Sequence, residues 1–210
     1  MTRTTRRQVE AAERGLHRRR FLEAVGLAGA GVAALYAWHD RPLAGAQAPG
    51  DVDITEFALI LSTLEVTYWE QGLRRELLTG RDREVAQAIR DHAVQHRRVM
   101  VETLTDLGAD PLEEADFHVP EEAFADRDAF FTMGSRLEEL WVEGYHGLLT
   151  AIASPELTML TAALAGSKSR HAAMVALLLE GEALVGPVER AGDPARLLEE
   201  ISMFRGDQDA

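Results

Sequence analysis

The feature that most restricts the fold of this chain is a helical periodicity that recurs four times after residue 50. Apolar side chains return every three or four positions in each run, and no run of similar length has the two-residue period of a strand. Four helices with one apolar stripe each bury those stripes best against one another. The sequence therefore predicts an all-α four-helix bundle with helices at about 53–79, 82–108, 126–153 and 155–182.

Residues that cap or break helices separate these four runs. Gly80 and Gly108 are expected to end the first and second helices, and Ser154, followed by a proline, is suited to start the fourth. The acidic segment 109–124 is longer than most helix connections, so we expect it to cross the end or side of the bundle. A short amphipathic helix near 194–204 is expected to dock on the outside.

An arginine-rich leader precedes the bundle. Residues 1–46 carry a formal charge of +4, and the rest of the chain carries −17, because the total is −13. Residues 18–22 read Arg-Arg-Arg-Phe-Leu, which fits the twin-arginine pattern of two arginines, one free position and Phe-Leu. The apolar stretch 24–38 is shorter than the roughly 20 residues that a membrane-spanning helix needs. Small residues then favour cleavage after Ala46.

This order of charge, apolar stretch and small residues predicts export across the cytoplasmic membrane, to the periplasm, the cell envelope or the medium. We expect a signal peptide at 1–46, the bundle at 47–186 and a C-terminal extension at 187–210. The expected partner is the twin-arginine translocase, with membrane contact only through the leader before cleavage. A leader retained as a membrane anchor is the alternative. The twin-arginine resemblance also implies transport of an already folded protein.

Composition removes several functional classes. The chain has no cysteine, which excludes disulfides, thiolate metal sites and cysteine nucleophiles. The acidic body repels phosphate backbones, so we expect no nucleic-acid partner. The sequence has no glycine-rich phosphate loop and no Gly-x-Ser-x-Gly motif.

Titratable residues interrupt every apolar stripe near its middle. A buried charge costs several kcal/mol unless it is paired or bound to a metal. Side chains that interrupt four helices at a similar height should therefore meet in the interior of the bundle. The interrupting residues are Glu65 in the first run, His92 and His96 in the second, Glu138 in the third, and Lys168 and His171 in the fourth.

These residues and their neighbours resemble the bacterial ferritin-like domain proteins, relatives of the di-iron carboxylate bundles. The resemblance runs from Ile54 to about Glu182 and rests on residues 64–71 (LEVTYWEQ), 92–96 (HAVQH), 137–139 (LEE) with a downstream Gly-Tyr, and 169–173 (SRHAA). In such bundles two helices each supply one Glu, and the other two each supply Glu-x-x-His.

The resemblance assigns Glu65 and Glu138 to the two single glutamates, and His96 and His171 to the two histidines. The two partner carboxylates are missing: Ala93 stands three residues before His96, and Lys168 stands three residues before His171. The resemblance therefore implies an incomplete di-iron ligand set, with an ammonium where an anion belongs. An ordinary di-iron centre, and its oxygen chemistry, is not expected.

Three interpretations of this polar cluster remain open. In the first, Lys168 lies between Glu65 and Glu138 as a buried ion-pair cluster that replaces the metals, with His96 and His171 hydrogen-bonded beside it. In the second, those two glutamates and two histidines, with His92 as an auxiliary ligand, hold one Zn, Mn or Fe ion while Lys168 turns aside. In the third, a shifted pairing supplies a missing carboxylate from Glu70, Glu139 or Glu143.

We expect a non-enzymatic envelope protein with a structural or binding role and no resident cofactor, or at most one Fe, Mn or Zn ion. The alternative is a metal-dependent redox or iron-handling protein that uses the reduced ligand set. A homo-oligomer is compatible with the pattern, since caged and single bundles share it. The tryptophans Trp69 and Trp141 are expected to be packing residues.

Overall fold

The structure is a computed structural model of the chain. It describes residues 50–111, 117–149, 151–181, 191–192 and 194–204. The predicted signal peptide, the cleavage position and most of the segment 182–193 lie outside the described residues. None of the described helices combines the length and apolar character that crossing a bilayer requires.

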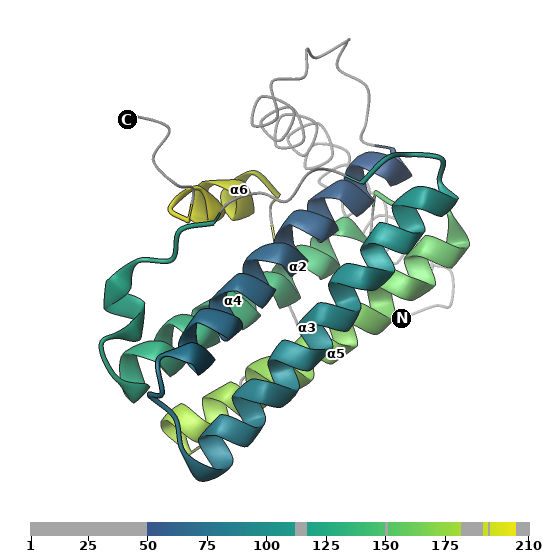
Figure 1. Ribbon diagram of the computed structural model, residues 1–210. Coiled ribbons are helices and arrows are strands. Elements are labelled where there is room, and N and C mark those ends of the chain that lie inside the picture. Colours follow the sequence, from purple (N-terminus) through teal and green to yellow (C-terminus); the bar gives the residue numbers. More distant parts are fainter. Residues whose placement is uncertain (1–49, 112–116, 150, 182–190, 193, 205–210) are drawn as a thin grey trace, which may run out of the picture.

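The described residues form five α-helices and one 3₁₀ helix, and no strand of a sheet occurs among them. Four long helices make up the bundle, so the predicted all-α fold is confirmed (Figure 1). The elements are α2 (Asp51–Arg74), α3 (Gly80–Asp106), η1 (Glu121–Phe124), α4 (Arg127–Leu148), α5 (Pro155–Glu180) and α6 (Pro194–Ser202).

Side-chain caps fix where the second pair of long helices begins. The Asp126 carboxylate accepts a hydrogen bond from the Ala129 backbone N–H at 2.8 Å and caps α4. The Ser154 hydroxyl accepts from the backbone N–H of Leu157 at 3.2 Å and caps α5, as the sequence predicts. The helix α5 stops at Gly181, whose φ of 78° is the left-handed conformation that glycine adopts most easily.

Two helices end earlier than the periodicity predicts. Helix α2 ends at Arg74 rather than near residue 79, because Glu76 has a φ of 57° and turns the chain out of the helix. Helix α4 ends at Leu148 rather than near residue 153. There the Asp51 carboxylate accepts hydrogen bonds from the backbone N–H groups of Ala153 and Ser154, which holds those residues in the turn.

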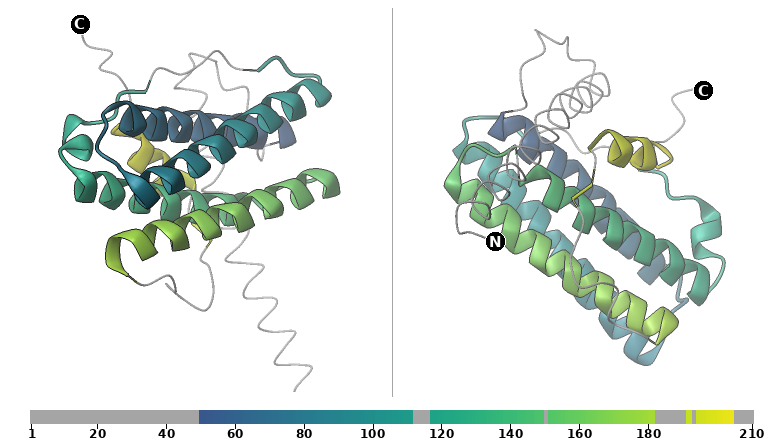
Figure 2. Two further views of the ribbon diagram at one scale, coloured as in Figure 1. Left: turned by 60° about the horizontal axis from the view of Figure 1, so that its bottom comes forward. Right: turned by 180° about the vertical axis from the view of Figure 1, so that it is seen from behind.

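The long helices are arranged as two antiparallel hairpins, α2 with α3 and α4 with α5, joined by a long crossover (Figures 1 and 2). An ion pair of 2.5 Å between Arg127 and Asp82 sets the start of α4 beside the start of α3. Arg127 also donates to the Leu178 carbonyl near the end of α5. Helices α3 and α4 are therefore parallel, and the connection between them runs the length of the bundle, as predicted for a crossing segment.

The buried face of α3 differs from the predicted stripe by about one position. The sequence stripe included His92, but His92 is solvent-exposed and its neighbour Ala93 is fully buried. Small alanines on the inner face let α3 pack closely against α2, with which it shares its most extensive contact. The inward residues of α3 are Val85, Ala86, Ile89, Ala93, Met100 and Leu104.

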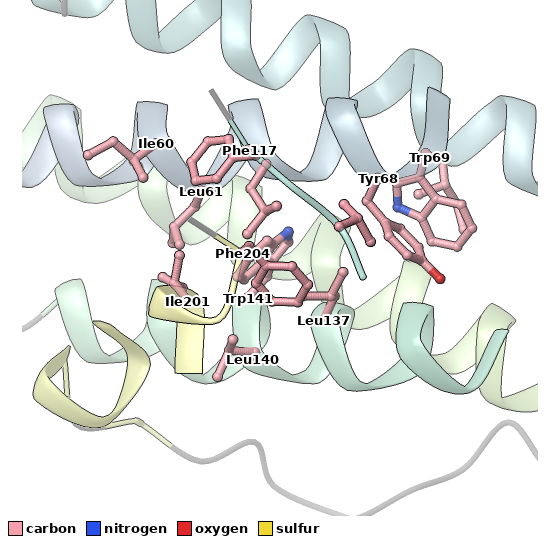
Figure 3. Packing of buried hydrophobic residues seen from close by; sticks show 14 of the residues in the cluster. Ile60, Leu61, Tyr68, Trp69, Phe117, Leu137, Leu140, Trp141, Ile201 and Phe204 are labelled. Atoms are coloured by element: carbon pink, nitrogen blue, oxygen red, sulfur yellow. The ribbon is translucent and has the colours of Figure 1, made fainter. Parts of the chain in front are cut away.

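The C-terminal helix α6 covers the outer side of α2 and α4. Its Ile201, together with Phe204 just beyond it, is buried in the same core as Leu61 and Trp141 (Figure 3). The backbone N–H of His118 in the crossover donates to the Phe204 carbonyl at 2.8 Å. The crossover and the C-terminus thus close one side of the bundle together, and α6 docks on the outside as the sequence predicts.

Candidate functional site

The titratable cluster lies in the centre of the bundle, where three helices bring four buried side chains together. Glu65 comes from α2, Glu138 from α4, and Lys168 and His171 from α5. The two glutamates and the lysine are at most 1% exposed, and His171 is 5% exposed. Lys168 and His171 are three residues apart, so one face of α5 delivers both.

Lys168 forms a fully buried ion pair with Glu65. Its ammonium donates to Oε2 of Glu65. Burial opposes charge on both groups, but the two glutamates raise the pKa of Lys168 above its usual value. Burial likewise works against the Glu65 carboxylate, yet Lys168, with help from His171, lowers the pKa of Glu65 to about 2. Both partners are therefore charged at neutral pH.

Glu138 has a different environment from Glu65. Its Oε1 accepts a hydrogen bond from the indole N–H of Trp69 at 3.2 Å. Burial and the negative charge of Glu65 raise the pKa of Glu138, because both favour the neutral carboxyl group. The two carboxyl groups of the site thus have pKa values shifted in opposite directions.

His171 points its Nδ1 atom at both carboxylates. This nitrogen lies 3.5 Å from Oε2 of Glu138 and 3.8 Å from Oε1 of Glu65, beyond ordinary hydrogen-bond distance. All three atoms are buried and have no hydrogen-bond partner among the described residues. They lie within 4.8 Å of one another, so three unpaired ligand atoms face a common point.

The other nitrogen of His171 leads toward the surface. Its Nε2 is 2.9 Å from Nδ1 of His92 on α3, and the two rings are nearly parallel with centroids 5.1 Å apart. Because His92 is exposed, a hydrogen-bonded pair of imidazoles connects solvent with the buried carboxylates. Burial and the positive charges of His171 and Lys168 lower the pKa of His92.

His96 lies beside the cluster without joining the group of three ligand atoms. Its ring centroid is 6.1 Å from that of His171, and its Nδ1 is buried without a hydrogen-bond partner in the described part of the chain. Burial, followed by the charge of Lys168, lowers the pKa of His96 to about 3, so His96 is neutral. At Nδ1, the expected hydrogen bond from His96 to the cluster is therefore not found among the described residues.

The carboxylates of the third interpretation do not point into this pocket. Glu70 lies within 3.6 Å of Arg74 at the surface, and Glu139 is exposed. Glu143 packs beside Gly192. The second interpretation also needs a correction, because Lys168 does not turn aside: it is fully buried and bonded to Glu65.

The residues present fit one metal ion and not two. Two imidazole or carboxylate ligands of one tetrahedral ion, each about 2.1 Å from it, lie about 3.4 Å apart. The separations of 3.5 and 3.8 Å from His171 to Glu138 and Glu65 are close to this value. The group has only three such ligand atoms, and a second ion beside Glu65 would adjoin the Lys168 ammonium.

A model of the family described as Ferritin-like domain matches residues 50–181, which is more than half of the chain and contains all four long helices. The chain belongs to the ferritin-like family. A search of curated proteins gives no match. The ferritin-like fold places Glu65, Glu138 and His171 at the centre of the bundle, and the cluster that they form could hold a metal ion.

Two contacts of the site were not predicted from the sequence. Trp69 packs in the core as expected, but it also donates to Glu138. Its spacing of four from Glu65 on α2 was the available signal for this second role. His92 was expected among the inward residues. It instead contacts His171 from the exposed side, and no local pattern indicated that contact.

Proposed function

We propose that this chain is an exported ferritin-like protein in which a buried lysine replaces the family's metal pair, and that it has a structural or binding role instead of oxygen chemistry. The observation that supports this proposal best is the ion pair between Lys168 and Glu65 in the centre of the bundle. An ammonium at this position offsets carboxylate charge that metal ions would otherwise neutralise.

The charges of the cluster support a site that is stable without metal. Lys168 and Glu65 cancel each other. Glu138 has a raised pKa, and so does His171, where the carboxylates outweigh the effect of burial. One proton shared by Glu138 and His171 leaves that pair neutral as well, whichever group holds it. The interior is therefore close to electroneutral without any cation.

Export is the second part of the proposal and rests on the leader. Residues 18–22 carry the twin-arginine pattern, and residues 44–46 offer the small side chains that a signal peptidase reads. We propose that the twin-arginine translocase carries the folded bundle across the membrane and that cleavage follows Ala46. The closed hydrophobic core of α2–α5 suits a route that transports folded proteins.

A second candidate function is the handling of one divalent transition-metal ion. The observation that favours it is the group of unpaired atoms formed by Glu65 Oε1, Glu138 Oε2 and His171 Nδ1. Two carboxylates and one imidazole suit Fe²⁺, Mn²⁺ or Zn²⁺. A bound iron or manganese ion would supply one-electron redox chemistry, while Lys168 would hold Glu65 in place and Trp69 would orient Glu138.

Metal analysis of the protein purified from its native host without chelators tests both candidates. Less than about one-tenth of an ion per chain, with unchanged stability after chelation, supports the metal-free cluster. One iron or manganese per chain supports the second candidate. Two ions per chain would refute both.

The variant Lys168→Glu tests the replacement directly, because it restores Glu-x-x-His on α5. We expect it to bind one more divalent ion per chain than the wild-type protein does, measured by Co²⁺ titration with visible absorption. Lys168→Met is the matched control, since it removes the ammonium without adding a ligand. Equal stoichiometry in Lys168→Glu and Lys168→Met would contradict the proposal.

A further inference from the structure

The contact between His92 and His171 links the state of the buried pocket to an exposed side chain. A single hydrogen bond of 2.9 Å joins Nδ1 of His92 to Nε2 of His171. One of these nitrogens donates and the other accepts. The tautomer of His171 is therefore coupled to the tautomer of His92.

The direction of this hydrogen bond decides what the pocket can bind. If His171 donates from Nε2, a neutral His171 presents a bare lone pair at Nδ1, directed at the unpaired oxygens of Glu65 and Glu138. Three lone pairs then meet, and either a proton on Glu138 or a metal ion has to lie between them. If His171 accepts at Nε2, its Nδ1 carries a hydrogen toward the carboxylates, and no cation fits.

We propose that His92 is a positioning residue that holds His171 as the Nε2–H tautomer, so that Glu65, Glu138 and His171 can bind one divalent transition-metal ion. This inference rests on the second candidate function, the handling of one divalent ion, and it places the Lys168 ammonium beside the position of any further ion. A hydrogen bond from the far nitrogen of a histidine ligand commonly fixes its tautomer and orientation in metal sites.

The geometry of His92 suits a hydrogen-bond acceptor, because its ring lies nearly parallel to that of His171 and presents Nδ1 to Nε2 of His171 at 2.9 Å. A neutral imidazole has one nitrogen free to accept a hydrogen bond. Because His92 is exposed and outside the core, its substitution should leave the fold intact.

The chemical class of the ligand follows from the donor atoms. One imidazole nitrogen with two carboxylate oxygens suits Zn²⁺, Fe²⁺, Mn²⁺ or Co²⁺, whereas Mg²⁺ and Ca²⁺ prefer oxygen ligands alone. The nearby Lys168 ammonium repels a cation, so binding should be weaker than at a site with four carboxylates.

The test uses the mature chain titrated with Co²⁺ and followed by visible absorption. The wild-type protein should bind one Co²⁺ per chain. His92→Leu should weaken this affinity by about tenfold or more, the usual effect of losing an outer partner of a ligand. His92→Asn should recover part of the loss, because its amide lies where Nδ1 lay. The matched control is His118→Leu, which changes an exposed histidine in the crossover and should have no effect.

Long-range ¹H–¹⁵N correlation spectra of the histidine rings supply a readout that a merely structural role would not change. His171 should be the Nε2–H tautomer in the wild-type protein, and His92→Leu should shift it toward Nδ1–H.

An unchanged tautomer and an unchanged Co²⁺ affinity in His92→Leu would overturn the role of His92 while leaving the replacement by Lys168 intact. Failure of the wild-type protein to bind Co²⁺ would overturn the inference and favour the metal-free cluster. Binding of two Co²⁺ ions would overturn both this inference and the proposed function.

Discussion

At the scale of single residues, the position of Lys168 decides the character of the site. It is three residues before His171, so the same face of α5 carries both side chains into the bundle. The long lysine side chain lets its ammonium reach Glu65 on another helix, while its methylene groups pack in the core. The side chain at this position therefore acts as an internal counter-ion for Glu65.

Removing the lysine charge should destabilise the protein because Glu65 would remain buried without its partner. We expect Lys168→Met to lower the free energy of unfolding by about 3–5 kcal/mol, measured by urea denaturation near neutral pH. Lys168→Met combined with Glu65→Leu should recover most of this loss, since no charge stays unpaired. The control Arg98→Met breaks an exposed pair with Glu102 and should change stability by no more than about 1 kcal/mol. Equal effects of Lys168→Met and Arg98→Met would contradict a buried pair.

The same residues predict a pH dependence of stability. His96 has its pKa lowered from 6.5 to about 3 by burial and by Lys168, so its contribution is lost as the pH falls from about 6.5 toward 3. Glu65, with a pKa of about 2, adds a second loss below pH 4.5. His171 has a raised pKa, so its contribution is lost as the pH rises above 6.5.

Stability should therefore decline in acid, where the losses from His96 and Glu65 add, and decline again above pH 6.5. The raised pKa of Glu138 offsets part of the His96 loss between about pH 4.5 and 6.5. Urea unfolding across the pH range measures this profile. His96→Gln should flatten the decline between pH 6.5 and about 4.5, because the substituted side chain does not titrate. His118→Gln at an exposed position should keep the wild-type profile. A wild-type profile in His96→Gln would show that His96 is not held neutral by the fold.

The sequence predicted part of this site and missed the rest for physical reasons. Interruptions of apolar stripes located Glu65, Glu138, Lys168 and His171, because buried charges have to meet one another. Sequence analysis could not exclude His96 from the site. Rotating α3 by about one position changes which residues are buried but leaves the apolar periodicity almost unchanged. Directional contacts between helices depend on rotamers and crossing angles, which sequence spacing does not specify.

At the scale of helices, the close approach of α2 to α4 depends on glycine at a position where a β-carbon would clash with the neighbouring helix. A β-carbon added to Gly72 on α2 would lie 2.1 Å from the ring of Phe130 on α4. Phe130 is fully buried and stacks on Tyr68, so its ring cannot move aside freely. Helix α2 therefore tolerates a poor helix former near its C-terminal end because the packing against α4 requires it.

Two glycine substitutions should consequently change the stability of the protein in opposite directions. Gly72→Ala should destabilise the protein by about 1–3 kcal/mol, because the added methyl group overpacks the contact with Phe130. Gly166→Ala on α5 should stabilise it by up to about 1 kcal/mol, since the nearest obstacle is a flexible Arg170 atom 3.8 Å away and alanine is the better helix former. Urea denaturation of both variants measures the difference. Destabilisation of equal size in both would contradict this packing.

The helices were the most predictable part of the structure, and their ends were the least. All four long elements occur where periodicity placed them, because an apolar stripe has to be buried along its whole length. The early end of α2 at Arg74 depends on the left-handed backbone of Glu76, and that of α4 depends on hydrogen bonds to Asp51 from another helix. The hydrogen bonds to Asp51 are tertiary contacts, which helical periodicity does not reveal. The left-handed backbone conformation of Glu76 is unusual for a glutamate, so the sequence did not indicate it.

At the scale of the whole molecule, the charged cluster lies inside a closed core. The crossover adds the buried Phe117, and α6 adds Ile201, to the same hydrophobic core (Figure 3). Leu197 of α6 belongs to this core as well. The histidine pair between α3 and α5 is then a polar connection between this interior and the surface. If the chain is exported as a folded body, as we propose, this closed core would keep its charged cluster intact.

Export of the chain can be tested at the leader. If the leader addresses the chain to the twin-arginine translocase, changing both Arg18 and Arg19 to Lys should leave the uncleaved precursor in the cytoplasm, although the leader keeps its charge. Changing Arg6 and Arg7 to Lys is the matched control, because that arginine pair lacks the following Phe-Leu and should not affect export. Cell fractionation and intact mass measure the outcome, and the exported protein should begin at Gln47. Export of the Arg18/Arg19 variant at the control level would assign the leader to another route, and an uncleaved wild-type protein in the membrane fraction would make it an anchor.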